Sequence, residues 1–432
     1  MSTDAKIRSC PAAHDRPAFP DFDPLTPDHV RDPWPLLARA RQEQPVFWMP
    51  QLQMYCVTRY DDIRKIHDDP ETFANAGANL MRVPIPEGIQ IPPGCPFPGV
   101  GEGVANQDGA SHTRLRSLMQ PAFRRARLAE FVSQLEQIAN DLIDHFIADG
   151  EADLVTQFAN PMAVRSIALV LGFPETDAVR FREWTDQFIF LMATPNMSDS
   201  EARRLWTGLI EWYQYIKAMV ESRRKMPQND LVSDLMTPPA DRAVAPLTDS
   251  EIIANIIAFI AAGTDTTAIF ITQTIRLLHS ERLWEKVRDD RSRLERVMEE
   301  CLRYVGVVRG LNRVVIRDTE LSGVKIPAGS VLYWMAASAN RDPAKFADPE
   351  RFDPDRKALF DHVAFSGGRH FCIGAPLARL ESKIALNSIM DRLPTLRVPD
   401  QVVEFHPNFL TPAPVRLQIE WTADRDLRPQ SS

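Results

Sequence analysis

Residues 365–374, Phe-Ser-Gly-Gly-Arg-His-Phe-Cys-Ile-Gly, place a cysteine between glycines and directly before a helix-forming run. Cys372 follows Gly368 by four residues and precedes Gly374 by two, and a proline falls in the first turn of the helix predicted for residues 375–391. Backbone N–H groups and the helix dipole at such an N-terminus favour the thiolate, the form of cysteine that binds metal. For a lone cysteine the alternative is a buried structural thiol.

A second stretch with chemical groups lies in the middle of a long helix predicted from residue 247 to about residue 278. Thr248 and Glu251 form a capping box at its start, and its length would be about 45 Å. Residues 261–267, Ala-Ala-Gly-Thr-Asp-Thr-Thr, weaken helical propensity, and threonine hydroxyls can bond the carbonyl one turn earlier. We therefore expect a functional kink there. The alternative is a packed helix with Asp265 in an ordinary ion pair.

Two basic or charged pairs occur at helical spacing. His112 and Arg116 are four residues apart and share one helix face, for which the alternative is a solvated basic surface. Glu300 and Arg303 are three apart, a spacing that is often a surface salt bridge of little energetic value.

The pattern Phe-x-x-Gly-x-His-x-Cys-x-Gly resembles the haem-ligand loop of the cytochrome P450 family. The resemblance implies that Cys372 is the axial ligand of the iron of haem b, where a thiolate pushes electron density onto the metal and favours O–O cleavage. It also implies which other residues bind the haem. These are His112, Arg116, Ala262, Arg313, Phe365, Gly368, His370 and Gly374, with the basic ones on the propionates.

Residues 262–266, Ala-Gly-Thr-Asp-Thr, are similar to the oxygen-activation motif of the same family. This implies that Thr266 hydrogen-bonds dioxygen and that Asp265 relays protons from bulk water. The remaining assignments concern structure and substrate. Glu300, Arg303 and Arg351 match a buried structural cluster, and Ala258, Ala261, Val308, Arg309 and Phe409 match positions around the substrate pocket.

Arg309 is unusual among these pocket positions because family members usually carry an apolar residue there. A buried guanidinium needs acceptors, and a carboxylate accepts from it bidentately. We therefore hypothesise a substrate with an acidic or strongly hydrogen-bond-accepting group on an apolar body. The alternative is that Arg309 turns away to an acidic side chain or solvent. Gly306 and Val307 replace the family's usual prolines, which leaves the path of this wall open.

Composition limits the classes of partner. The chain has 432 residues, with Lys plus Arg at 50 and Asp plus Glu at 58, for a net charge of −8. An acidic balance argues against nucleic acid as the main partner, because phosphate binding needs a basic surface. The five cysteines show no paired or CxxC spacing, which fits a reducing cytosol.

No membrane attachment is expected. The first twenty residues are polar and lack the apolar core of a signal peptide or anchor. The longest apolar stretch, residues 252–262, is too short to span a bilayer. We expect a cytoplasmic protein.

The fold expected is mainly α with a smaller β-rich portion, a single triangular cytochrome P450 haem domain over residues 25–421. An irregular extension (1–24) would precede it and a tail (422–432) would follow it. A long loop over residues 70–110 matches the region that folds over the substrate in the family. Helices are expected at 34–41, 60–67, 127–148, 159–172, 177–193 and 200–224, and strands at 46–49, 53–58, 314–318, 324–326, 330–334 and within 396–421.

The resemblance implies a monooxygenase that inserts one oxygen atom from dioxygen into a small, largely apolar organic substrate, by hydroxylation or O-dealkylation. No flavin or iron–sulfur segment is visible, so electrons would come from a ferredoxin and its reductase. One alternative is a peroxide-driven peroxygenase. A haem-thiolate sensor would not need Asp265 and Thr266, and a metal-free binding protein would leave Cys372 and the basic residues without a common purpose.

Overall fold

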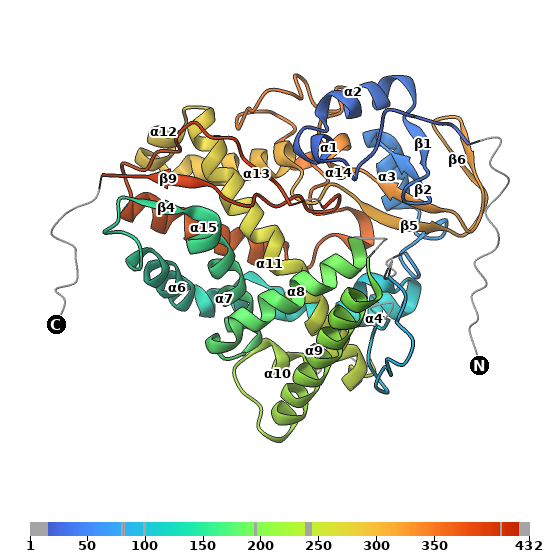
Figure 1. Ribbon diagram of the computed structural model, residues 1–432, viewed down its shortest axis with the longest axis horizontal. Coiled ribbons are helices and arrows are strands. Elements are labelled where there is room, and N and C mark those ends of the chain that lie inside the picture. The colour runs from blue at the N-terminus through green and yellow to red at the C-terminus, as the bar shows by residue number, and fades with distance from the viewer. Residues whose placement is uncertain are drawn as a thin grey trace.

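Helices make up most of the molecule, and the larger β sheet lies to one side of it (Figure 1). The computed structural model describes residues 16–78, 81, 83–97, 101–193, 197–237, 244–406 and 408–422. Nearly all of the expected C-terminal tail and most of the expected N-terminal extension lie outside these residues. The α helices are α1 (Pro27–Arg31), α2 (Trp34–Glu43), α3 (Tyr60–Asp68), α4 (Gly109–Met119), α5 (Arg125–Leu128), α6 (Val132–Asp144), α7 (Asn160–Leu171), α8 (Ala178–Ala193), α9 (Asp199–Lys225), α10 (Leu231–Met236), α11 (Asp249–Ser280), α12 (Trp284–Asp289), α13 (Leu294–Val305), α14 (Ala336–Ala339) and α15 (Ala375–Arg392).

The larger sheet joins the start of the chain to its last third. Its strand order is β1-β2-β8-β5-β3, with β2 parallel to β8 and the other neighbours antiparallel. Two further pairs are β4 with β9 and β6 with β7. The strands are β1 (Val46–Met49), β2 (Met54–Val57), β3 (Phe73–Ala74), β4 (Glu151–Asp153), β5 (Leu311–Val315), β6 (Thr319–Leu321), β7 (Val324–Ile326), β8 (Val331–Trp334) and β9 (Gln418–Glu420).

Helix α11 crosses the middle of the molecule (Figure 1), and α7, α8, α9, α13 and α15 pack against it. It has 32 residues, about 48 Å. The expected capping box is present, because Thr248 accepts from the Glu251 backbone and Glu251 accepts from the Thr248 backbone. By length and composition alone the helix would suit a membrane, but 78% of its most apolar window is buried inside the protein. It is therefore the central core helix.

The segment just before α1 packs against β1. Phe19 and Phe22 are buried, and their rings pack on Phe47 at centroid distances of 5.2 and 5.1 Å. The backbone N–H of Trp48 also donates to the carbonyl of Pro17 at 2.8 Å. The prolines around these positions suggested an irregular segment, and the two aromatic side chains supply apolar surface that fixes this segment against the sheet.

The long loop before α4 closes onto the helices beneath it. The Tyr213 hydroxyl on α9 donates to the carbonyl of Pro93 at 2.9 Å. The backbone N–H of Val104 donates to the side chain of Asn255 on α11, also at 2.9 Å. A polar side chain near the N-terminal end of the core helix thus fastens this loop.

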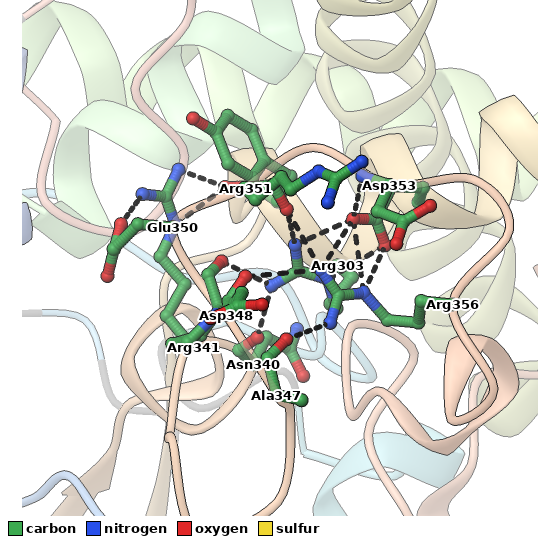
Figure 2. Close-up of polar contacts among 12 residues, drawn as sticks. Arg303, Asn340, Arg341, Ala347, Asp348, Glu350, Arg351, Asp353 and Arg356 are labelled. Carbon is green, nitrogen blue, oxygen red and sulfur yellow. Dashed lines mark hydrogen bonds and ion pairs between the residues drawn. The ribbon is translucent and has the colours of Figure 1, made fainter.

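A buried ion cluster holds α13 to the irregular segment that leads to Cys372 (Figure 2). Glu300 and Arg303 are fully buried, and the guanidinium donates to both carboxylate oxygens at 2.8 and 2.7 Å. The expectation of a buried structural pair is confirmed.

The third member of this cluster is Arg356, whereas the sequence indicated Arg351. Arg356 donates to Glu300 at 3.2 Å. Arg351 contributes only its carbonyl oxygen, which accepts from Arg303 at 3.1 Å and from Arg356 at 2.9 Å, while the residue itself is exposed. The assignment failed because the segment is irregular, and no periodicity shows which of its arginines turns inward.

Candidate active site

Cys372 lies between a 3₁₀ turn, Gly368–His370, and the start of α15. Its backbone N–H donates to the carbonyl of Phe365 at 2.9 Å, which closes the loop on itself. The thiol is half-buried, and the backbone N–H groups of Gly374 and Ala375 point toward it. The glycine turn at a helix N-terminus is therefore present as expected.

The electrostatics of the thiol differ from the expectation. Burial raises the pKa of Cys372 above its ordinary value, while the N–H groups of Gly374 and Ala375 and the guanidinium of Arg116 act in the opposite direction. The helix N-terminus thus has the expected sign, but loss of hydration is the larger effect. A thiol in this position becomes a thiolate by binding a metal cation, which displaces its proton.

The glycines of the loop are required by its contact with α3. Gly368 has φ +60°, and a Cβ atom there would collide with the carbonyl oxygen of His67. A Cβ atom on Gly367 would collide with the imidazole of the same histidine. The sequence assigned Gly368 to the cofactor, whereas the structure gives it a packing role that fixes the loop against α3.

Two histidines from distant parts of the chain meet beside this loop. The rings of His112 on α4 and His370 lie 4.1 Å apart between centroids. Asp108, the N-cap residue of α4, has a carboxylate oxygen 3.5 Å from Nε2 of His370. The pKa of Asp108 is lowered to about 2, because His370 and the N–H groups of two neighbouring residues outweigh its burial.

The turn of α11 around residue 262 opens in an otherwise buried helix. Ala262 is exposed, and Gly263 and Thr266 are half-buried, whereas Thr264 and Thr267 are buried. The Thr266 hydroxyl donates to the carbonyl of Ala262 at 2.6 Å, as expected for threonine in a helix. The helix continues through this turn without a break.

Asp265 faces α8 and forms an ion pair. Its carboxylate lies 2.7 Å from Nη1 of Arg182, which also pairs with Asp186. Burial raises the pKa of Asp265 above its ordinary value, and Arg182 opposes that shift. The contact named as the alternative in the sequence analysis is therefore present. It leaves an acid of raised pKa directly beside Thr266.

A buried carboxyl group links the two motifs. The Thr267 hydroxyl donates to Glu381 on α15 at 2.7 Å. Burial raises the pKa of Glu381 to about 8. Because α15 begins just after Cys372, this bond fastens the Thr266 turn to the helix that carries the cysteine loop. Sequence reasoning missed Glu381, although it lies on the buried face of α15 at helical spacing from Leu377.

Other neighbours of the site were also missed. His67 and Arg182 had no sequence signal, since each is brought in by tertiary packing. Asp108 had one, because an aspartate directly before a glycine-led helix is a typical N-cap.

The expected pocket residues separate into two groups. Ala258 and Val308 are half-buried and Ala262 is exposed, so these positions retain open surface, whereas Ala261 is buried in the main core. Phe409 is also buried. Its ring packs edge-on against Tyr333 of β8 at 5.6 Å, and its carbonyl accepts from the Tyr333 hydroxyl. The pocket role of Phe409 is therefore corrected, because its side chain fills the core against the sheet.

Arg309 does not point toward a substrate beside the cysteine loop. Its guanidinium donates to the carbonyl oxygens of His29, at 3.0 Å, and Val30. Neutral main-chain oxygens at the end of α1 thus take the place of the carboxylate that we hypothesised. The expectation that Arg309 selects an acidic substrate at the haem is corrected.

The family assignment follows from comparison with known proteins. The sequence model of the family described as Cytochrome P450 matches residues 93–419, more than half of the chain. The chain belongs to the cytochrome P450 family. It is 32% identical over 421 residues to the cytochrome P450 monooxygenase PikC of Streptomyces venezuelae, covering 95% of this chain and 96% of that protein.

Further relatives agree with this P450 assignment. The mycinamicin IV hydroxylase/epoxidase of Micromonospora griseorubida is 31% identical, over 85% of this chain and 90% of that protein. Among solved structures, cytochrome P450 CREJ in complex with (4-ethylphenyl) dihydrogen phosphate matches with a TM-score of 0.83 at 26% identity, covering 92% of this chain and 99% of that one. The expected fold is confirmed, and this P450 is an oxygen-incorporating oxidoreductase.

The family implies a haem-thiolate cofactor, and the basic residues of this P450 fit its two propionates. Burial lowers the pKa of Arg313 to about 10 and that of His112 to about 4, so the nearby Asp108 offsets only part of the cost of charging either group. Nε2 of His112 is buried without a hydrogen-bond partner in the described part of the chain. Both ring nitrogens of His67, which lies against the loop, are likewise unpaired. Two carboxylates would satisfy these donors.

Proposed function

We propose that this P450 is a monooxygenase in which Cys372 is the axial ligand of haem b and the Thr266 turn of α11 delivers protons. The substrate is a small, largely apolar organic molecule. One oxygen atom of dioxygen enters the substrate and the other leaves as water, with two electrons and two protons consumed. When bound, the haem supplies the redox chemistry, and the protein supplies orientation, water exclusion and protons.

The observation that carries this proposal is the connection between the two motifs. The open turn of α11 and the helix behind Cys372 are joined through Thr267 and Glu381 at 2.7 Å. The half-buried hydroxyl of Thr266 on α11 and the half-buried thiol in the loop just before α15 thereby belong to two joined elements, as a substrate between them would require.

Thr266 and Asp265 have different roles in proton delivery. The hydroxyl of Thr266 is held by the carbonyl of Ala262, so its lone pairs and its proton have a fixed place at the open turn. Asp265 has a pKa raised by burial, which brings the acid closer to working pH. Arg182 keeps that carboxylate anchored on α8.

Electrons would come from separate proteins, and we infer a ferredoxin and its reductase in the cytoplasm. Support comes from the relatives, which are bacterial P450s of similar length. Ala258, Ala262 and Val308 supply the apolar wall expected for the substrate.

The test is the coupling of electron use to product formation in haem-loaded protein, with a substrate first found by its spin shift. Thr266→Ala should keep haem content but release more reducing equivalents as peroxide. Asp265→Asn should slow turnover on the order of 10²-fold. Thr264→Ala is the matched control, because its hydroxyl makes the same backward bond, to Ile260, but is buried.

Unchanged coupling and rate in both Thr266→Ala and Asp265→Asn would overturn the proton-delivery proposal. Full activity with peroxide alone, together with no turnover on dioxygen, would instead assign the enzyme as a peroxygenase.

A further inference from the structure

A second cavity lies away from the cysteine loop, on the C-terminal half of α11. Its volume is about 230 Å³, and α1, α2, the end of α13, Phe405 and Pro412 contribute to its walls. Neither Cys372 nor Thr266 lines it, and its first α11 residue is Ile269. The cavity is therefore separate from the site of the proposed function, and ligand binding to it can be measured without catalytic turnover.

The wall of this cavity is strongly cationic. Four arginines line it together with one carboxylate, the exposed Glu281. Arg31 is also paired with Asp28 and Arg341 with Glu350, which leaves Arg276 and Arg309 without an ion pair in the described part of the chain. The four are Arg31, Arg276, Arg309 and Arg341. Two of them are almost fully buried, Arg309 with 6% of its surface exposed and Arg341 with 4%. Buried guanidinium groups are costly unless anions or acceptors surround them.

Arg309 has only neutral hydrogen-bond acceptors and is not paired with a carboxylate in the described part of the chain. Its two terminal nitrogens donate only to neutral carbonyl oxygens, those of His29 and Val30. Its Nε is buried and has no hydrogen-bond partner in the described part of the chain. Burial lowers the pKa of Arg309 to about 10, and the nearby Tyr333 and Asp32 offset that loss of hydration only in part.

The other arginines are held in place before any ligand arrives. The guanidinium of Arg341 lies between the rings of Trp34 and Tyr304, 3.6 and 3.9 Å from their centroids. It donates to the Tyr304 carbonyl and is paired with Glu350, as Figure 2 shows. Such fixed donors lose little conformational entropy on binding.

The two terminal nitrogens of Arg276 are available to a ligand. Its Nε donates to Gln273 at 2.6 Å, one turn earlier on α11. No acceptor for its two terminal nitrogens is found among the described residues, and burial lowers its pKa. A planar fork with open terminal nitrogens matches the geometry of a carboxylate or phosphate.

We propose that this cavity binds a small oxyanion, a carboxylate or a phosphate, between Arg276 and Arg309. The volume lies below the roughly 300–1,000 Å³ typical of drug-sized ligands, so the anion is small. Arg309, which the sequence indicated as an anion-binding residue of the haem pocket, would keep that chemistry in a different place.

The test is calorimetric titration of the haem-loaded full chain with inorganic phosphate and with acetate, at constant ionic strength balanced by chloride. Saturable binding of at least one anion is expected. Arg276→Gln should weaken it roughly ten- to a hundredfold, the loss of one charge-assisted contact. Arg204→Gln, on the exposed surface of α9, is the control and should leave the affinity unchanged.

Two further measurements check that the anion binds the folded protein and that it binds away from the haem. The thermal midpoint should rise with anion concentration in the wild type and less in Arg276→Gln, because a ligand of the folded state stabilises it. The haem absorbance should not shift during the titration. No saturable binding of either anion, equal affinity in Arg276→Gln, or a haem shift that tracks binding would overturn the proposal.

Discussion

Donors surround the buried carboxylate of Glu300 on several sides. Arg303 and Arg356 donate to both of its oxygens, and the backbone N–H of Asp353 adds a bond at 2.8 Å. Removing one partner of such a buried group leaves an uncompensated charge, which costs far more than a surface pair contributes. At the scale of residues, the direction in which each guanidinium points therefore decides how much it contributes to stability.

This difference predicts unequal effects for two arginines of the same segment. Arg356→Gln should lower the free energy of unfolding by about 3–5 kcal/mol, since it leaves Glu300 short of a counter-charge. Arg351→Gln should change it by no more than about 0.5 kcal/mol, because its side chain is exposed and its carbonyl is retained. Urea unfolding of both variants measures the difference. Equal losses, or a larger loss for Arg351→Gln, would contradict the cluster as described.

The same scale shows what sequence motifs left open. Cys372 and Thr266 were indicated by local patterns whose spacing is specific, whereas Glu300 came from the family resemblance, because a Glu and an Arg three residues apart are common on helix surfaces. Arg309 and Arg351 were misplaced, because an arginine side chain is long and its acceptors come from elsewhere in the chain. Both lie in or next to irregular segments, where neither a period of two nor one of 3.6 tells which way a side chain faces.

At the scale of elements, the pair α11 and α15 is the frame of the site. Thr267 and Glu381 meet between them, and the hydroxyls of Thr267 and the nearby Ser166 are the polar groups beside this buried carboxyl group. A carboxyl group in such surroundings holds its proton, and burial accordingly raises the pKa of Glu381 to about 8. Burying this group between the helices is thus least costly when it is neutral, although the hydroxyl of Thr267 itself favours the ionised form.

This frame predicts a pH dependence of stability. The folded state binds the proton of Glu381 more tightly than the unfolded chain, whose pKa is near 4.5. The stabilising contribution is complete below the unfolded pKa and is lost as pH rises from there through about 8. Glu381→Gln cannot ionise, so over this window the wild type should lose up to about 5 kcal/mol relative to the variant.

Unfolding in urea at pH 5, 7 and 9 provides the measurement. Glu211→Gln, an exposed substitution on α9, should run parallel to the wild type at every pH. If Glu381→Gln also runs parallel, the carboxyl group is not held neutral between α11 and α15.

Most helices and strands could be predicted from the periodicity of apolar residues and from cap and turn residues. The capping box at Thr248, the helix behind Cys372 and the first hairpin agree with the sequence to within a few residues. The last strands did not, since β9 covers only Gln418–Glu420 and isolated bridges replace the rest. Pairing partners far apart in the chain, such as β2 with β8, leave no local signal at all.

At the scale of the whole molecule, residues from opposite ends of the chain surround one region. The sheet carries Arg313, α3 contributes His67, α4 contributes His112, and α15 begins beside Cys372. Arg313 and His112 lose hydration there and Asp108 offsets only part of that loss, so the two propionates of a haem would complete the arrangement. The account as a whole therefore depends on Cys372 being the sulfur ligand of that haem.

The most direct test is the absorbance spectrum of the reduced, CO-treated protein. The wild type should show the red-shifted band that thiolate ligation produces, and Cys372→His should lose it while retaining haem. Cys95→Ser, which changes another half-buried cysteine, should keep the band. A wild type without the red-shifted band, or a Cys372→His variant that retains both the band and activity, would contradict the assignment.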